Sequence, residues 1–247
     1  MRAYYNEHDN FAAEWLRQLI KRGYLPGGDV DTRSIVDVQP EDLRGYTQCH
    51  FFAGIGGWSY ALKIINATDL PIWTGSCPCQ PFSASGEKRG TDDERHLYPE
   101  FSRLIAACQP TVVFGEQVAS KLGRQWLSAV QNDLEILGYR TAAADLPAAS
   151  AGAPHKRQRL FWLGHANGKG LSRKSLRQLG SGSKSYWKDH DVLACLDAKL
   201  RWIEPGTFPL ADGVSNRVGR LRGYGNAIVP QVAALFALSA LQAIADV

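Results

Sequence analysis

The chain has 247 residues, 45% of them hydrophobic, which suffices for one sizeable domain with a small appendage. No stretch approaches the roughly 18 apolar residues that span a membrane, and the charged start MRAYYNEHDN lacks the apolar core of a signal peptide. The odd count of five cysteines favours free thiols over a disulfide framework, and the net charge is only +4. We therefore expect an intracellular, cytoplasmic protein.

Strand-like and helical patterns alternate through the first 165 residues, which predicts a parallel sheet covered by helices. Strands are expected at residues 3–5, 34–38, 49–53, 72–75, 111–114 and 160–163. Helices are expected at residues 11–21, 58–65, 97–108, 119–137 and 231–244. Residues 166 to 212 are rich in Gly, Ser and Lys with weak periodicity, which indicates a small, loop-rich insert.

The insert carries an uneven charge. Between residues 168 and 188 there are six lysines or arginines and no acidic residue. Most runs of this kind are solvated loops, but a basic surface also suits contact with phosphates. Charge alone does not choose between these two interpretations.

A glycine-rich turn, FAGIGG at residues 52–57, follows the third expected strand. Such turns let backbone N–H groups and a helix N-terminus approach a ligand, although many are simply tight turns. The dinucleotide fingerprint G-x-G-x-x-G would need glycine at position 59, which is Ser59, and this weakens a nicotinamide interpretation.

Two cysteines lie two positions apart in the segment SCPCQPFS, residues 76–83. No second Cys or His pair follows at the spacing of a zinc site, and a disulfide across one residue would be strained. The pair is therefore either two buried structural thiols or a loop with a nucleophile. A thiolate at the end of a strand, beside a helix start, would have a lowered pKa.

Taken together, these segments resemble the cytosine-C5 DNA methyltransferases. FAGIGG resembles motif I of that family and PCQPFS resembles motif IV, while DDERHLYPEFSRLI, FGEQV, GAPHKRQRLFWLG and GYGNAIVP resemble motifs V, VI, VIII and X. The resemblance implies an S-adenosylmethionine-dependent methyltransferase. Its fold would be a Rossmann-like α/β sheet with helices on both faces. It implies a catalytic domain at residues 1–165, a target-recognition region at 166–212 and a segment at 213–247 that returns to the catalytic domain.

The resemblance also assigns roles in the reaction. Cys79 would add to C6 of the cytosine, Glu116 would bind or protonate N3, and Arg157 and Arg159 would hold O2 and the DNA backbone. Each role has a structural alternative, such as a strand-end carboxylate or a surface basic cluster. Further contacts with the base or the DNA are expected from Gln80, Ser83, Lys169, Arg173 and Lys174. The chain departs from the family pattern at Gln117, where Asn is usual, and at His155, where Gln is usual.

The order of the motifs departs further from the family. Only 21 residues separate Gly57 from Cys79, too few for the two strand–helix units that the family places there. YNEHDNFAAEWL and GDVDTRSI, both ahead of motif I, resemble motifs II and III. We therefore expect a circular permutation, which folds tolerate where the cut lies in an exposed loop. The cofactor would be bound by Glu7, His8, Asp29, Val30, Phe52, Ala53, Gly54, Gly56, Gly57 and Asn226. If the chain is permuted, Glu7 and Asp29 should lie beside Gly54 and Gly56 at the carboxyl ends of adjacent parallel strands. The strand that carries Phe52 should then lie between the strands near Tyr5 and Trp73.

The substrate that the resemblance implies is a cytosine flipped out of double-stranded DNA. The resemblance also implies an enzyme of the bacterial or phage-encoded type. No metal is expected, and we expect a monomer. The sequence does not decide whether a restriction endonuclease partner exists or which DNA sequence is the target. Two alternatives remain: thiol-dependent modification of free dCMP, and a catalytically silent DNA-binding relative. The basic insert disfavours the first, and the retained Cys79, Glu116 and Arg159 disfavour the second.

Overall fold

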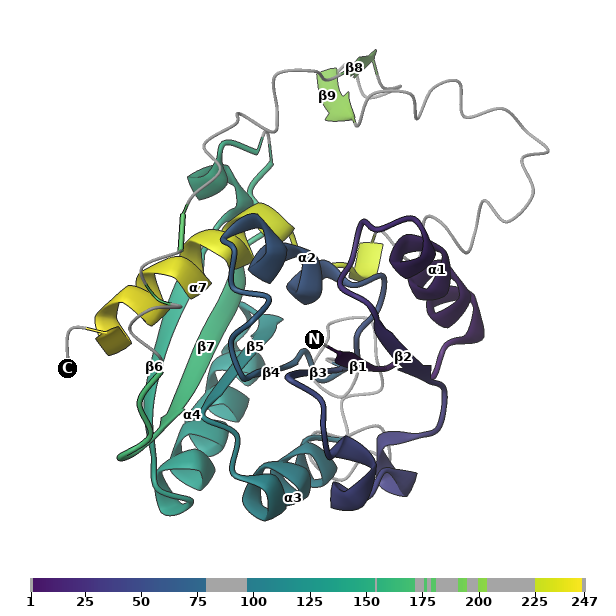
Figure 1. Cartoon of the computed structure of the whole chain (residues 1–247). Coiled ribbons are helices and arrows are strands. Elements are labelled where there is room, and N and C mark those ends of the chain that lie inside the picture. Colours follow the sequence, from purple (N-terminus) through teal and green to yellow (C-terminus); the bar gives the residue numbers. More distant parts are fainter. Residues whose placement is uncertain are drawn as a thin grey trace.

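The computed structural model describes residues 2–78, 97–153, 155–171, 176, 179–180, 191–194, 200–203 and 225–245. A seven-stranded sheet in the order β2-β1-β3-β4-β5-β7-β6 forms its centre (Figure 1). Five neighbouring strands are parallel, and β7 runs antiparallel to both β5 and β6. The strands are β1 Ala3–Asn6, β2 Gly28–Asp31, β3 Gln48–Phe51, β4 Ile72–Gly75, β5 Val112–Val118, β6 Tyr139–Leu146 and β7 Arg159–Ala166.

Helices cover both faces of the sheet. One face carries α1 (Asn10–Lys21), α2 (Gly57–Ile64) and α7 (Pro230–Ala245), and the other carries α3 (Tyr98–Cys108) and α4 (Lys121–Ile136) (Figure 1). Each face of the sheet has its own hydrophobic core, and successive strand residues point to opposite faces. Trp73 and Val113 pack on the α3–α4 side, while Ile72 and Val112 pack on the α2–α7 side. The expected α/β architecture is thus confirmed.

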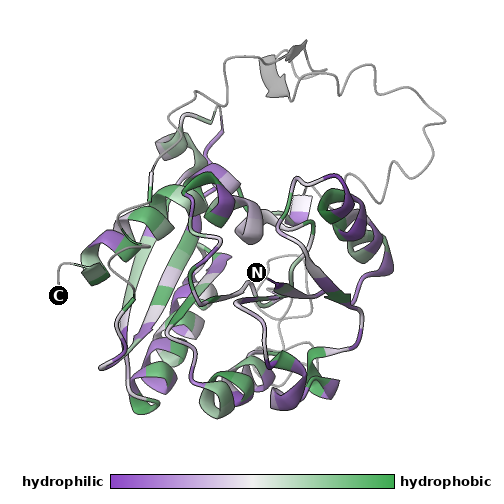
Figure 2. Ribbon diagram, in the orientation of Figure 1, coloured by the Kyte–Doolittle hydropathy of each residue, from purple (hydrophilic) through white to green (hydrophobic). Residues whose placement is uncertain are grey.

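Local sequence signals explain where several helices begin. Asp9 caps α1 by accepting a hydrogen bond from the Ala12 amide at 2.9 Å, and Ser120 caps α4 through the Gly123 amide at 2.9 Å. Figure 2 shows the contrast between α7, which is mostly apolar, and α1, which presents many hydrophilic residues. The apolar α7 lies against α2 and buries seven of its residues, so the last described helix closes the core beside the glycine turn.

Three expectations about the strands need correction. Residues 34–38 do not form a strand, because Ile35–Asp37 is a short 3-10 helix capped by Ser34, and the strand lies earlier at β2. The sequence pattern also missed β6, whose Ala-rich middle is largely exposed or half-buried and so lacks an apolar alternation. The sheet is mixed rather than wholly parallel, because β7 lies between β5 and β6 and runs antiparallel to both.

The expected insert is only partly within the described residues. Two short antiparallel strands, β8 (Asp191–Ala194) and β9 (Leu200–Ile203), form a hairpin there. Within the described part of the chain, no helix is both long enough and apolar enough to cross a bilayer.

Candidate functional site

The site is built at the edge of the sheet where the parallel strands end, here termed the carboxyl edge. Strand β3 lies between β1 and β4, as the motif order predicts, so the segments after Asn6, Phe51 and Gly75 emerge side by side. Ligand sites of open α/β sheets form at such an edge, because loops from neighbouring strands converge there.

Glu7 joins the first two of these segments. Its Oε2 accepts the Gly54 amide at 2.7 Å, and its Oε1 accepts the Asp9 amide at 2.8 Å. The expectation that Glu7 lies beside the glycine turn is therefore confirmed. A carboxylate fixed by two backbone N–H groups keeps further lone pairs, which can accept hydrogen bonds from the hydroxyl groups of a ligand.

The glycine turn has a backbone shape that explains its sequence. Gly54 and Gly56 have φ values of 56° and 84°, in the left-handed region that glycine tolerates best. No atom would meet a Cβ at Gly54, whereas a Cβ at Gly56 would lie 2.4 Å from Leu25 and one at Gly57 would lie 2.7 Å from Ile228. The turn is therefore open at Gly54 and tightly packed at the two glycines that lead into α2.

The residues on either side of Glu7 and Gly54 complete this part of the site. The Ala53 amide donates to the Asn6 carbonyl at 3.0 Å, which ties the turn to the end of β1. Phe52 is half-buried with a left-handed φ of 52°, and its ring meets Phe101 edge to face. The exposed His8 is oriented by a 3.0 Å contact between its Nδ1 and the Thr32 carbonyl.

Asp29 does not lie where the sequence placed it. It pairs with Tyr4, two positions before the end of β2, and its carboxylate is held by Arg2 at 2.6 Å and by the Tyr46 hydroxyl at 2.6 Å. The hydrogen bond from Tyr46 and the guanidinium of Arg2 hold the pKa of Asp29 below its usual range. The expectation that Asp29 stands beside Gly54 and Gly56 is therefore wrong in register, and the half-buried Val30 lies one position nearer the edge.

Asp31 is the carboxylate at the end of β2, and the sequence interpretation passed over it. Arg33 pairs with it at 2.7 Å, and the Tyr4 hydroxyl donates to it at 2.7 Å. The same guanidinium reaches Asp42 at 2.9 Å. The alternation of β2 gave a signal for this residue, because Asp29 and Asp31 point to the same face.

Glu116 and Arg159 form the second part of the site. Strand β4 ends opposite Gly115, and β5 continues for three residues paired only with β7. On this extension Arg159 Nε lies 2.8 Å from Glu116 Oε1, with the side chains 23% and 12% exposed. Burial raises the pKa of Glu116, and the neighbouring Arg159 and Arg157 oppose that shift. The carboxyl group of Glu116 is therefore buried, and its pKa lies above the usual range.

The segment after β4 leads towards the predicted nucleophile. Trp58 Nε1 donates to Ser76 Oγ at 3.0 Å, and Cys77 is buried, which raises the pKa of its thiol and leaves it inert. The predicted residues Cys79, Gln80 and Ser83 lie outside the described residues. Next to Glu116, Gln117 is 2% exposed, and its Nε2 has no hydrogen-bond partner among the residues that the structure describes.

Arg157 and Asn226 meet at a third part of the site. Arg157 Nη2 donates to the Gly225 carbonyl at 2.8 Å and to the Ala227 carbonyl at 2.6 Å, on either side of the exposed Asn226. Ile228, next along the turn, is the side chain that packs over Gly57. The segment that resembles motif X therefore lies between the basic cluster and the glycine turn.

Lys169 belongs to another part of the molecule. Its ammonium group donates to the Gln109 carbonyl, close to where β5 begins, and Ala166 bonds to Thr111 nearby. Strand β5 rises six steps from Val112 to Val118, about 20 Å at 3.3 Å per residue. The bond to Gln109 and this distance argue against the expected contact between Lys169 and DNA, and Arg173 and Lys174 lie outside the described residues.

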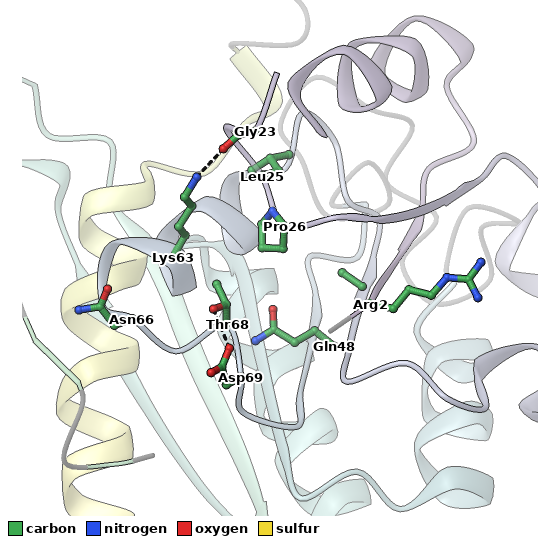
Figure 3. Close-up of a pocket in the computed structure, with 10 residues that line it drawn as sticks. Arg2, Gly23, Leu25, Pro26, Gln48, Lys63, Asn66, Thr68 and Asp69 are labelled. Carbon is green, nitrogen blue, oxygen red and sulfur yellow. Dashed lines mark hydrogen bonds between the residues drawn. The ribbon is translucent and has the colours of Figure 1, made fainter. Parts of the chain in front are cut away.

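A cavity of about 540 Å³ also opens near the start of β1 and β3 (Figure 3). Arg2, Gln48, Lys63 and Asp69 are among its lining residues, and Lys63 Nζ is already bonded to the Gly23 and Tyr24 carbonyls. Neither Glu7 nor Glu116 is among its lining residues. No cluster of three potential metal ligands occurs among the described residues.

Comparison with known proteins decides the family. The C-5 cytosine-specific DNA methylase family matches residues 63–194, just over half of the chain. The chain belongs to this family. The methyltransferases of this family act on DNA cytosine and use S-adenosylmethionine.

Individual relatives of the methylase chain cover less of it. Type II methyltransferase M.AplI of Arthrospira platensis is 40% identical over 100 residues, which are 40% of this chain and 28% of that protein. Type II methyltransferase M.HhaI of Haemophilus parahaemolyticus is 27% identical over 169 residues, 52% of each chain. The chain thus spans about half or less of the length of these relatives. The crystal structure of the S. pombe Dnmt2 methyltransferase aligns with a TM-score of 0.42 and 16% identity, over 74% of this chain and 56% of that one.

Proposed function

We propose that this methylase transfers a methyl group to C5 of a cytosine flipped out of double-stranded DNA. The observation that carries the proposal is the buried pair of Glu116 and Arg159 at the carboxyl edge, with a raised pKa at Glu116. Strand β5 passes the end of its neighbour β4, and the described segment 76–78 that follows β4 leads towards Cys79. An acid and a guanidinium at this edge, combined with the proposed nucleophile Cys79, suit addition to a pyrimidine ring.

The proposed chemistry begins at the thiol. C5 of cytosine is too electron-poor to attack a methyl donor, but addition of the Cys79 thiolate to C6 shifts electrons to C5. Glu116 supplies the proton that neutralises N3 during this addition, and Arg159 holds O2 and keeps Glu116 oriented. C5 then takes up the methyl group. Loss of the C5 proton to solvent, return of the N3 proton to Glu116 and breakage of the bond between C6 and sulfur, which releases the Cys79 thiolate, restore the ring.

The carboxyl edge also fits the methyl donor. Glu7 offers its free lone pairs to ribose hydroxyls, the open Gly54 allows close approach, and His8, Val30, Phe52, Ala53 and Asn226 surround the same edge. We keep Asp29 as a proposed adenine contact, reached only if its bonds to Arg2 and Tyr46 exchange. When bound, S-adenosylmethionine supplies the methyl group that C5 receives.

We further propose that the chain is circularly permuted. What supports this is that β1 and β2, which come first along the chain, occupy the side of β3 where the second and third strands of the doubly wound order 3-2-1-4-5 are found. The bond between Glu7 and Gly54 supports it as well, because it joins the motif II-like and motif I-like segments.

The insert at 166–212 is proposed to recognise the target sequence, with Arg173 and Lys174 on phosphates. The names of the relatives as Type II methyltransferases support a restriction endonuclease as the biological partner, and a monomer is the proposed state. These assignments are independent of the chemistry at Glu116.

The test is a transfer assay with S-adenosylmethionine labelled in its methyl group. We expect label in 5-methylcytosine of unmethylated genomic DNA, no label in free dCMP, and no transfer by Cys79→Ser. Transfer to dCMP alone would replace DNA with a nucleotide substrate. Cofactor binding without transfer to any DNA would identify a silent relative.

A further inference from the structure

The motif X turn, residues 225–229, is held from one side by a single guanidinium. Arg157 uses the two N–H groups of one nitrogen, Nη2, for the carbonyls of Gly225 and Ala227, at 2.8 and 2.6 Å. The residue between these carbonyls is Asn226, whose own side chain is exposed. Two bonds that flank one residue fix the direction in which that residue projects.

The other side of the turn rests on the glycine turn. Ile228 is 7% exposed and fills the space that a Cβ at Gly57 would need. The Ala233 amide bonds to the Val229 carbonyl at 3.2 Å, so the turn passes directly into α7, which packs on α2 (Figure 1). The turn is therefore clamped between Arg157 and the start of α2.

The backbone of Arg157 shows that its position is imposed by its surroundings. Its φ is +28°, a value that residues with a Cβ rarely adopt. Strain of this kind persists only where other contacts hold the residue in place. The side chain is half-buried and also interacts electrostatically with Glu116 and Arg159.

We propose that Arg157 is a positioning residue for the cofactor half of the site, because it holds the two carbonyls that flank Asn226 against the glycine turn. This inference rests on the proposed function. It moves Arg157 away from direct contact with the base or the DNA backbone and leaves the proposed contact with O2 to Arg159, which pairs with Glu116. One loop, 155–159, thereby serves both halves of the site.

The test measures cofactor affinity in the absence of DNA. Arg157→Met keeps the apolar stem and removes both bonds, and the dissociation constant for S-adenosylmethionine, measured by titration calorimetry, should rise about tenfold. Lys156→Met is the matched control, because it removes an exposed cation from the neighbouring position and should change affinity less than about twofold. A residue that contacted only the base or DNA phosphates would leave this affinity unchanged.

A double-mutant cycle shows whether Arg157 acts through the turn. On an Asn226→Ala background, Arg157→Met should weaken binding by less than about threefold, because the side chain that it positions is gone. Full additivity of the two changes would overturn the proposal. Thermal unfolding identifies a variant that fails to fold, and Arg157→Lys, which can still reach one carbonyl, would then have to show an intermediate loss of affinity.

The outcomes separate this inference from the proposed function. Wild-type affinity in Arg157→Met together with slower transfer to DNA would overturn the positioning role and leave the proposed function standing. No binding of S-adenosylmethionine by the wild-type protein would overturn both.

Discussion

The parallel and antiparallel parts of the sheet build the two halves of the site in different ways. Strands β1 to β4 have four residues each and end nearly level, so their loops gather at one edge and present Glu7 half-buried on backbone amides. Strands β5 and β7 have seven and eight residues, and β5 runs past its parallel neighbour. This extension carries the acid Glu116 in a buried pair with Arg159.

The difference shows how one sheet can supply two kinds of acidic group. A carboxylate at a strand end, bonded to N–H groups, remains available to accept hydrogen bonds from a ligand. The carboxyl group of Glu116 is buried and loses solvent, so its pKa rises. Changes in the parallel part should therefore affect cofactor affinity, and changes in the antiparallel part should affect the rate of transfer.

The largest effect is expected at the proposed nucleophile, Cys79. Cys79→Ser should lower the rate of methyl transfer about a thousandfold or more, because a hydroxyl is a far weaker nucleophile, while affinity for S-adenosylmethionine stays near the wild-type value. Cys77→Ser is the control and should retain transfer, since Cys77 is buried and its thiol is inert. An inactive Cys77→Ser beside an active Cys79→Ser would reverse the assignment.

Glu116→Gln should lower the maximal rate by about a hundredfold or more, the range for loss of a proton donor, without changing cofactor affinity. Burial raises the pKa of Glu116, so the wild-type rate should fall as pH rises through that pKa and the carboxyl loses its proton. The residual rate of the variant should lack this decline. Steady-state rates across a pH series would show both, and an unchanged pH profile would contradict the role.

Glu7→Gln tests the parallel part. It keeps one carbonyl oxygen for a backbone amide but removes the charge, and the dissociation constant for S-adenosylmethionine should rise about tenfold. The rate at saturating cofactor should change little. A lower saturated rate with unchanged affinity would mean that the two halves are not separate. Glu14→Gln on the exposed side of α1 is the matched control.

The smallest effect concerns the basic run. Arg173→Ala with Lys174→Ala should reduce the slope of log affinity for DNA against log salt by about 0.9 for each phosphate that the protein no longer neutralises. Lys169→Ala should leave this slope unchanged, because its ammonium group is bonded to Gln109 far from the carboxyl edge. Equal slopes for the wild-type protein and all variants would mean that the basic run is a solvated loop and does not contact DNA phosphates.

The sequence was sufficient to locate those helices and strands whose apolar residues recur with a regular helical or strand period. The α1, α2, β4 and α3 segments match their expected ranges within a residue or two, because apolar periodicity and Asp9, Gly75 or Pro99 mark their ends. Strand β6 could not be found in this way, since residues 142–144 are alanines with no strand preference and their pairing with β7 decides the structure.

The motif resemblance located the residues of the site better than it described their partners. It brought Glu7 to Gly54 across 47 positions of sequence, yet it placed Asp29 at the end of a strand that continues to Asp31. It named Arg157 without the bonds to Gly225 and Ala227, because a contact across about 70 residues depends on how α7 returns to the sheet. Register and long-range contacts are set by tertiary packing, which short motifs do not encode.

The one-sided pairing of β5 has a consequence for motion. Residues 112–115 are bonded to strands on both sides, whereas residues 116–118 depend on β7 alone. Backbone amides with a single neighbouring strand open more readily, so hydrogen exchange should become faster along β5 towards Val118. The strip that carries Glu116 can then loosen without opening the core below it, and under the proposed function we expect the protein to adjust there when the cytosine binds.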